Sequence, residues 1–162
     1  MGKSSKKVSL QNGHIASNRA ARHNYEILDK FEAGLVLLGS EVKSLRYGRA
    51  AIGDGYISIT DDGEAWIENI SIPPFERAAT NKWVNHEDRR KRKLLLHRLE
   101  ISRIQKGIQQ KGFTAVPLAL YFLRGRAKLE FGLARGKKLH DKREALKTKQ
   151  VNRELAREVK LR

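Results

Sequence analysis

The sequence predicts an all-β protein with a few short helices. Apolar and polar residues alternate along several segments between residues 25 and 134, the pattern of strands with one buried face. Short turns join successive segments, so neighbouring strands pair mainly as hairpins in an antiparallel sheet. In a chain of 162 residues, a sheet of about six strands hides its edges best by curling. We therefore expect a closed, OB-like antiparallel barrel.

The composition divides the chain into three parts. Residues 1–17 are polar, rich in Gly, Ser and Lys, and lack periodicity, so we expect a disordered N-terminal arm. Residues 18–136 contain the alternating segments and form the predicted barrel domain. Residues 137–162 hold ten Lys or Arg and four Asp or Glu with only a thin apolar stripe. This last part is a basic tail without a core of its own.

The barrel is expected to open with two strands and a helix. Residues 25–30 and 34–38 are the strands, and the glycine between them permits a bend or bulge. Residues 40–48 form a short helix, because Ser40 can cap its first amides and Gly48 can take the left-handed conformation at its end.

The middle of the chain predicts a hairpin followed by a long loop. Residues 56–60 and 64–71 alternate on either side of an Asp-Asp-Gly turn, and two prolines end the second strand. Residues 76–93 show no clean period and read as a loop that ends in five consecutive basic residues. Such a run either grips phosphates or stays solvated, and the sequence leaves both interpretations open.

The last part of the barrel predicts a helix and a second hairpin. Residues 97–111 place isoleucines on one face, and Gly112 ends the helix. Residues 113–123 and 126–134 alternate across a tight Arg-Gly reversal. In these strand patterns Trp66, Tyr121 and Phe122 are expected to fill the core.

The tail changes to a helical period. Asp141 and Glu144 have the spacing of a capping box, and Val151, Leu155 and Val159 recur every four residues. Such a helix is marginal alone in water because nucleation is costly and no second layer packs on it. We expect the tail to be disordered when free and helical when bound.

The positive charge is concentrated in three places. The formal net charge is +16, and residues 1–22, 89–93 and 137–162 contribute all of it, because the remaining charges cancel. A protein whose charges serve solubility alone intersperses both signs. Concentrated basic segments on an otherwise neutral fold are typical of nucleic-acid binding.

The same sequence argues against an enzyme and against a membrane protein. The five histidines show no metal-binding spacing, and no glycine-rich loop has the pattern that cradles phosphates, so we expect no cofactor and no metal. The carboxylate pairs lie in a turn and a loop, where solvated turn residues are the simpler reading. The chain has no cysteine and no apolar run of about 20 residues, which favours a reducing, cytoplasmic location and no membrane partner.

Five segments together resemble the SsrA-binding protein family, also called small protein B. The resemblance covers about residues 18 to 143, and its motifs read Asn-Arg-Ala-Ala-Arg-His (18–23), Phe-Glu-Ala-Gly (31–34), Gly-Ser-Glu-Val-Lys-Ser-Leu-Arg (39–46), Arg-Lys-Leu-Leu-Leu-His (92–97) and Ala-Arg-Gly-Lys-Lys-Leu-His-Asp-Lys-Arg (134–143). The motifs at residues 39–46 and 134–143 together are highly specific. Two positions depart from the family pattern, Ala20 in place of a basic residue and His140 in place of tyrosine.

The resemblance implies an RNA-binding adaptor that binds the tRNA-like domain of transfer-messenger RNA (tmRNA) and delivers it to stalled ribosomes for trans-translation. It implies seven RNA-contacting positions: Asn18, Arg19, Arg22, Glu32, Lys43, Leu95 and Lys128. Polar side chains can read hydroxyls and base edges, Lys neutralises phosphate, and Leu offers an apolar face to an unstacked base. The alternative is a general rRNA-binding, ribosome-associated protein with an OB-like barrel.

The resemblance also assigns the tail to the ribosome. It implies that the tail probes the decoding centre and the empty mRNA channel of the small subunit, against rRNA. The residues implied in that contact are Gly136, Lys137, Lys138, His140, Asp141, Lys142 and Arg143. Further implied partners are the translation elongation factor that carries aminoacyl-tmRNA, and tmRNA itself in a one-to-one complex with a monomer.

Overall fold

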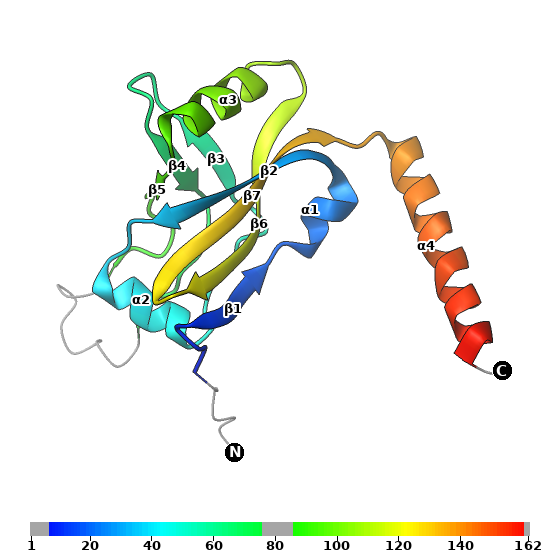
Figure 1. Ribbon diagram of the computed structural model, residues 1–162, viewed down its shortest axis with the longest axis horizontal. Coiled ribbons are helices and arrows are strands. Elements are labelled where there is room, and N and C mark those ends of the chain that lie inside the picture. Colours follow the sequence, from blue (N-terminus) through cyan, green and yellow to red (C-terminus); the bar gives the residue numbers. More distant parts are fainter. Residues whose placement is uncertain (1–6, 76–85, 161–162) are drawn as a thin grey trace.

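The computed structural model describes residues 7–75 and 86–160 as one antiparallel sheet with short helices around it and a long helix that extends away from it (Figure 1). The sheet has seven strands in the order β1-β6-β7-β2-β5-β4-β3. The strands are β1 (Asn12–Ser17), β2 (Tyr25–Leu35), β3 (Tyr56–Ile59), β4 (Ala65–Glu68), β5 (Arg92–Leu95), β6 (Phe113–Leu123) and β7 (Arg126–Gly136). The helices are α1 (Arg19–Asn24), α2 (Gly39–Arg46), α3 (Arg98–Ile108) and α4 (Leu139–Lys160).

The mainly antiparallel fold is confirmed, with seven strands where about six were expected, but closure into a barrel is not seen in the pairing. The hydrogen-bonded order runs from β1 at one edge to β3 at the other, and no ladder among the described residues joins these two edges. The sheet nevertheless curls far enough to bring β3 into contact with β6, a strand with which it does not pair. Gly55 lies at this approach, where an added Cβ would come 3.1 Å from the ring of Pro117.

The extra strand comes from the segment that was expected to be disordered. Residues 12–17 form β1, which pairs with β6 from Asn12 opposite Leu123 to Ser17 opposite Ala119. The expected disorder of this part is therefore wrong, and residues 1–6 lie outside the described residues. The physical reason is that β6 would otherwise present an unpaired edge, and a neighbouring strand satisfies its backbone groups.

The central hairpin is the longest pairing of the sheet. β6 and β7 pair from Phe113 opposite Arg135 to Leu123 opposite Arg126, and both turn residues, Arg124 and Gly125, have positive φ. The predicted reversal at this site is confirmed. β2 is one continuous strand rather than two, with an irregular register between Ile27 and Asp29 and not at the expected bend near Gly34.

The hydrophobic core lies on the inner face of this curled sheet. Phe31 of β2 and Phe131 of β7 stack there with ring centroids 5.6 Å apart. Ile104 of α3 and Leu45 of α2 are fully buried against the same cluster. A smaller cluster lies beneath α1, where Ala21 packs on β6 and β7. One face of the central strands is thereby buried; α1 covers one end of their other face, and the rest of that face is open.

The predicted helices agree with the structure within a few residues. Residues 40–48 were expected and α2 spans Gly39–Arg46; residues 97–111 were expected and α3 spans Arg98–Ile108. His97 is the N-cap residue of α3, and its N–H donates to Glu100 at 2.9 Å. Within the described residues, no helix is long and apolar enough to span a membrane.

Candidate nucleic-acid interface

A row of paired residues crosses the exposed face of the sheet through five strands. Gly34 of β2 pairs with Leu95 of β5 on one side and with Lys128 of β7 on the other. Lys128 pairs with Tyr121 of β6, which pairs with His14 of β1. Directly paired residues of an antiparallel sheet present their side chains on the same face. The row therefore lines up an apolar group, a cation and two rings.

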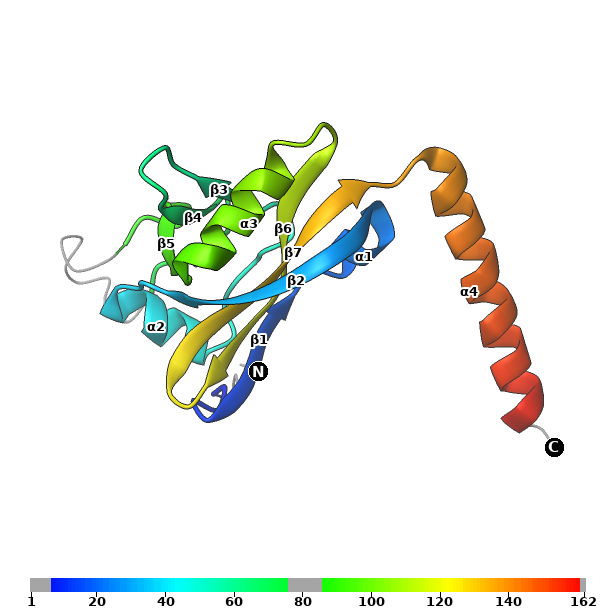
Figure 2. The ribbon, with the colours of Figure 1, turned by 45° about the horizontal axis from the view of Figure 1, so that its top comes forward.

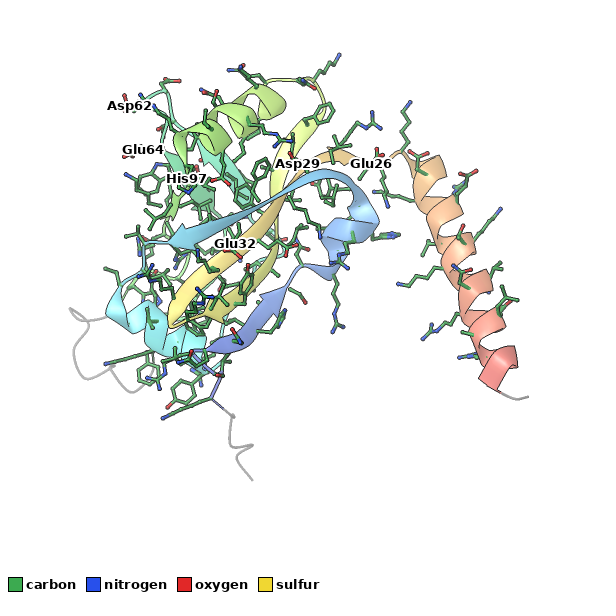
Figure 3. All side chains as sticks on the ribbon, viewed as in Figure 1. Glu26, Asp29, Glu32, Asp62, Glu64 and His97 are labelled. Atoms are coloured by element: carbon green, nitrogen blue, oxygen red, sulfur yellow. The ribbon has the colours of Figure 1, made fainter. Side chains whose placement is uncertain are left out.

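Glu32 lies two residues before Gly34 on β2, on the same face as this row, and two residues of the row hold its side chain. Its Oε2 accepts a hydrogen bond from the hydroxyl of Tyr121, and its Oε1 lies 3.4 Å from Nζ of Lys128. The Tyr121 bond first, and then Lys128, hold the pKa of Glu32 below its usual range, although burial opposes them. The carboxylate therefore stays ionised at neutral pH. Figure 3 shows Glu32 near the middle of the sheet.

Three of the expected RNA-contacting residues share one groove. A hollow of ≈ 890 Å³ is lined by Glu32, Leu95 and Lys128 together with residues of α3 and of the β3–β4 turn. Leu95 is 57% exposed, although it stands in a run of three leucines, because Leu94 takes the core position and Leu96 is half-buried. The groove thus offers the apolar surface of Leu95 beside the charges of Glu32 and Lys128, and its wall also includes Glu64, Glu100, Lys93 and Arg126.

Asn18 has a structural task at the start of α1. Its side chain is buried; its Oδ1 accepts from the N–H of Ala21 at 3.0 Å, and its Nδ2 donates to the carbonyl of Pro117 at 3.0 Å. A further contact joins Nδ2 to the carbonyl of Gly53 at 3.4 Å. These bonds cap the helix and fasten it to β6. The structure therefore pairs the Asn18 side-chain amide with backbone groups of the protein in a buried position.

The basic residues of α1 line a second groove beside α4. The hollow of ≈ 600 Å³ brings together Arg19 and Arg22 of α1, Lys137 after β7, and Lys149 of α4. It adjoins the first groove, because its wall includes Glu130, the residue of β7 that pairs with Glu32. The expected contacts on α1 and those on the central strands thus lie on one continuous surface.

The residues of the basic run 89–93 pair with other side chains of the protein. Arg92 is fully buried and its Nε donates to Glu41 Oε1 at 2.8 Å, while Arg90 donates to both oxygens of the same carboxylate. Lys91 pairs with a glutamate of β4, and Lys93 with a glutamate just before that strand. Burial raises the pKa of Glu41, but the bonds from Arg90 and from the Leu38 N–H and the charge of Arg92 outweigh it. Arg92 is therefore unavailable to phosphate, whereas Arg89 and Lys91 are exposed, and for them the two interpretations stay open. Residues 76–85 of the same loop lie outside the described residues.

The remaining expected residues are spread over α2 and the start of the tail. Lys43 is exposed on α2. Gly136 ends β7, and the backbone and side chain of Lys137 donate to the carbonyls of Asn24 and Arg22 at 2.9 and 3.1 Å. These two bonds fix the exit of the tail to the end of α1.

The first turn of α4 contains the other expected ribosome contacts. Asp141 accepts from the N–H of Lys138 at 3.3 Å, so the helix begins at Leu139, three residues earlier than a capping box of Asp141 and Glu144 implies. Lys138 and Arg143 are exposed and Lys142 is half-buried. His140 belongs to α4, and its side chain lies outside the described residues.

Tyr121 is the residue whose role was misjudged from the sequence. It was assigned to the core, but it is half-buried and its hydroxyl binds Glu32 on the open face. Phe122 is buried as expected, and Trp66 is only half-buried. The register of the final hairpin was the available signal: counting back from its two-residue turn places Tyr121 opposite Lys128.

These features define a class of protein. A curved antiparallel sheet with a groove of mixed polar and apolar groups, next to a basic helical tail, is typical of RNA-binding β proteins. Among the described residues, no three His, Asp or Glu side chains gather to hold a metal ion.

The comparison with known protein families identifies the particular family within this class. Residues 15–161 match the model of the SmpB protein family, and the chain belongs to that family. The SsrA-binding protein of Streptomyces coelicolor is 54% identical over 90% of this chain and 89% of its own length. The SsrA-binding protein of Nocardioides sp. is 55% identical over the same shares. A solved structure described as "tmRNA-SmpB: a journey to the center of the bacterial ribosome" is 46% identical, covers 83% of this chain and 95% of its own, and has a TM-score of 0.66.

Proposed function

We propose that this protein is a tmRNA-binding adaptor of trans-translation. It binds the tRNA-like domain of tmRNA with the exposed face of its sheet and delivers it to stalled ribosomes in the cytoplasm. Membership of the SmpB family carries this proposal, together with the similarity to SsrA-binding proteins and to a structure of tmRNA with SmpB. Its action is binding and delivery, not catalysis.

The chemistry of the first groove supports RNA recognition by particular residues. The ionised carboxylate of Glu32 accepts hydrogen bonds from base edges or ribose hydroxyls, while Lys128 neutralises a phosphate. Exposed Leu95 offers an apolar surface to an unstacked base. Arg19 and Arg22 on α1 extend the same surface with two further cations for the RNA backbone.

The curled sheet supports an OB-like scaffold for this surface. β3 contacts β6 across the core, so the seven strands wrap around one hydrophobic interior and leave one face open. In OB folds such a face, with its loops, binds nucleic acid. Asn18 serves this scaffold by capping α1, so its part in RNA binding is to hold Arg19 and Arg22 in place.

The tail supports the second task, contact with the ribosome. α4 extends away from the sheet, and Figure 2 shows the same separation from a second angle. Residues Gly136 to Arg143 meet rRNA at the decoding centre, and the basic helix enters the mRNA channel where no message is left. A message in the channel would occupy the same volume, which lets the tail sense that the channel is empty.

Competition binding tests the RNA specificity directly. Labelled tmRNA should stay bound to the full chain in a large excess of tRNA, and Glu32→Ala should weaken tmRNA binding about tenfold. The weakening is informative because the substitution removes a negative charge, which on charge alone favours RNA binding. Equal competition by tRNA would instead indicate general rRNA binding, and tighter binding of Glu32→Ala would mean that Glu32 is only a surface charge.

A further inference from the structure

We propose that Tyr121 is a specificity-determining residue of the tmRNA interface, which acts by fixing the direction in which the Glu32 carboxylate faces RNA. This inference rests on the proposed function. It adds a residue of β6 to the expected RNA contacts, which lie on α1, α2, β2, β5 and β7 or next to them, and it assigns that residue a positioning role.

The geometry gives each oxygen of Glu32 its own protein donor. The hydroxyl of Tyr121, on β6, donates to Oε2, and the ammonium of Lys128, on β7, lies 3.4 Å from Oε1. The three side chains come from three adjacent strands, in registers set by the β2–β7 and β6–β7 pairing. An exposed glutamate normally samples many rotamers. Two donors on rigid strands instead hold this one in a single orientation.

The held carboxylate keeps lone pairs for RNA. Each carboxylate oxygen offers about two acceptor sites, and the protein donors use one on each oxygen. The remaining sites suit a donor pair such as the N1–H and N2–H₂ edge of guanine, or a ribose hydroxyl. The Glu32 side chain is 44% exposed, so these sites are open to solvent.

The electrostatics keep both partners in the form that the contact needs. The Tyr121 hydrogen bond and Lys128 lower the pKa of Glu32, so it remains an acceptor. Burial and the adjacent carboxylate raise the pKa of Tyr121 well above its usual range, so its hydroxyl remains a donor. A carboxylate near phosphates repels RNA unless it finds a matching donor, so a fixed Glu32 rejects RNA that lacks that donor.

A second tyrosine–glutamate–lysine group in the same protein supplies a matched control. Tyr56 of β3 donates to Oε2 of Glu68 at 3.2 Å, and Lys91 lies 2.9 Å from the same oxygen. This group has the same three residue types but belongs to β3, β4 and the segment before β5, away from the Glu32 groove. Tyr56→Phe therefore removes a tyrosine–glutamate hydrogen bond outside the Glu32 groove, where the Ser58 hydroxyl, at 2.6 Å, continues to hold Glu68.

The experiment measures affinity for tmRNA and for tRNA in five full-length chains: wild type, Tyr121→Phe, Tyr56→Phe, Glu32→Ala and the double variant Tyr121→Phe/Glu32→Ala. Phenylalanine keeps the half-buried ring and removes only the hydroxyl. We expect Tyr121→Phe to weaken tmRNA binding about three- to tenfold, with little change for tRNA. Tyr56→Phe should bind as wild type does. In the Glu32→Ala background, Tyr121→Phe should have no further effect.

Each other outcome overturns the inference in a recognisable way. Wild-type affinity in Tyr121→Phe would show that the hydroxyl has no role in recognition. An equal loss for tmRNA and tRNA, or an additive loss in the double variant, would show that Tyr121 does not act through Glu32. A loss matched by a lower Tm would show a structural role only. If the wild type itself does not prefer tmRNA, the proposed function fails instead.

Discussion

At the residue scale, Glu32 and Glu41 show two uses of a carboxylate in one basic protein. Glu41 is fully buried and pairs with both Arg90 and Arg92, so its charge is neutralised within the protein. Glu32 is 44% exposed and bound by Tyr121 and Lys128, so it remains open to a ligand. Their sequence contexts do not distinguish these roles, because the side-chain partners of both residues are at least 49 positions away.

The buried pair predicts an unequal stability effect within the basic run. Arg92→Met leaves the buried Glu41 with one cation fewer and its remaining hydrogen bonds incomplete, so the free energy of unfolding should fall by about 3 kcal/mol. Lys91→Met removes an exposed partner of Glu68 and should cost less than about 1 kcal/mol. Urea denaturation of the two variants measures both values. Equal stability of the two would contradict the buried role of Arg92.

At the element scale, α1 depends on a single capping residue. The helix has only six residues, too few to be stable alone, and the side chain of Asn18 joins it to β6 and to the turn before β3. Arg19 and Arg22 project from this short helix into the second groove. The positions of these two arginines therefore depend on the cap.

Asn18→Ala should accordingly lose stability and affinity together. We expect the free energy of unfolding to fall by about 2 kcal/mol, from the lost cap and the unpaired carbonyl of Pro117, and tmRNA binding to weaken as α1 loosens. Glu32→Ala is the comparison, because it should weaken binding with an unchanged Tm. Parallel thermal unfolding and binding measurements test this. Unchanged stability of Asn18→Ala with lost affinity would instead assign Asn18 to direct RNA contact.

The elements also show what local sequence can predict. The β6–β7 hairpin was predictable because its alternation and its Arg-Gly turn act within 24 residues. β1 was not, because Asn12–Ser17 has no clear alternation and its partner β6 lies about a hundred residues away. The arrangement of the candidate site was unpredictable for the same reason. Leu95 and Lys128 meet at Gly34 only because β2 pairs with both β5 and β7, an order that no local pattern specifies.

At the scale of the whole molecule, the positive charge serves two purposes. The run 89–93 pairs with carboxylate or amide oxygens of α2, of β4 and of the residues that flank β4, so part of the basic charge of the folded body is paired internally. Most described charged residues of α4 are exposed. The body is therefore suited to recognition by particular residues, and the tail to charge-driven contact with rRNA. The expectation that the tail orders only on binding stays a prediction.

The division between body and tail is the central claim, and deletion of residues 137–162 tests it most directly. The truncated chain keeps the sheet, α1 and the Glu32 groove, so its tmRNA affinity should stay within about threefold of the full chain. Peptide tagging on stalled ribosomes in a reconstituted translation system should be abolished, because nothing remains to enter the mRNA channel. Loss of tmRNA binding on truncation, or tagging at the full rate without the tail, would contradict the account.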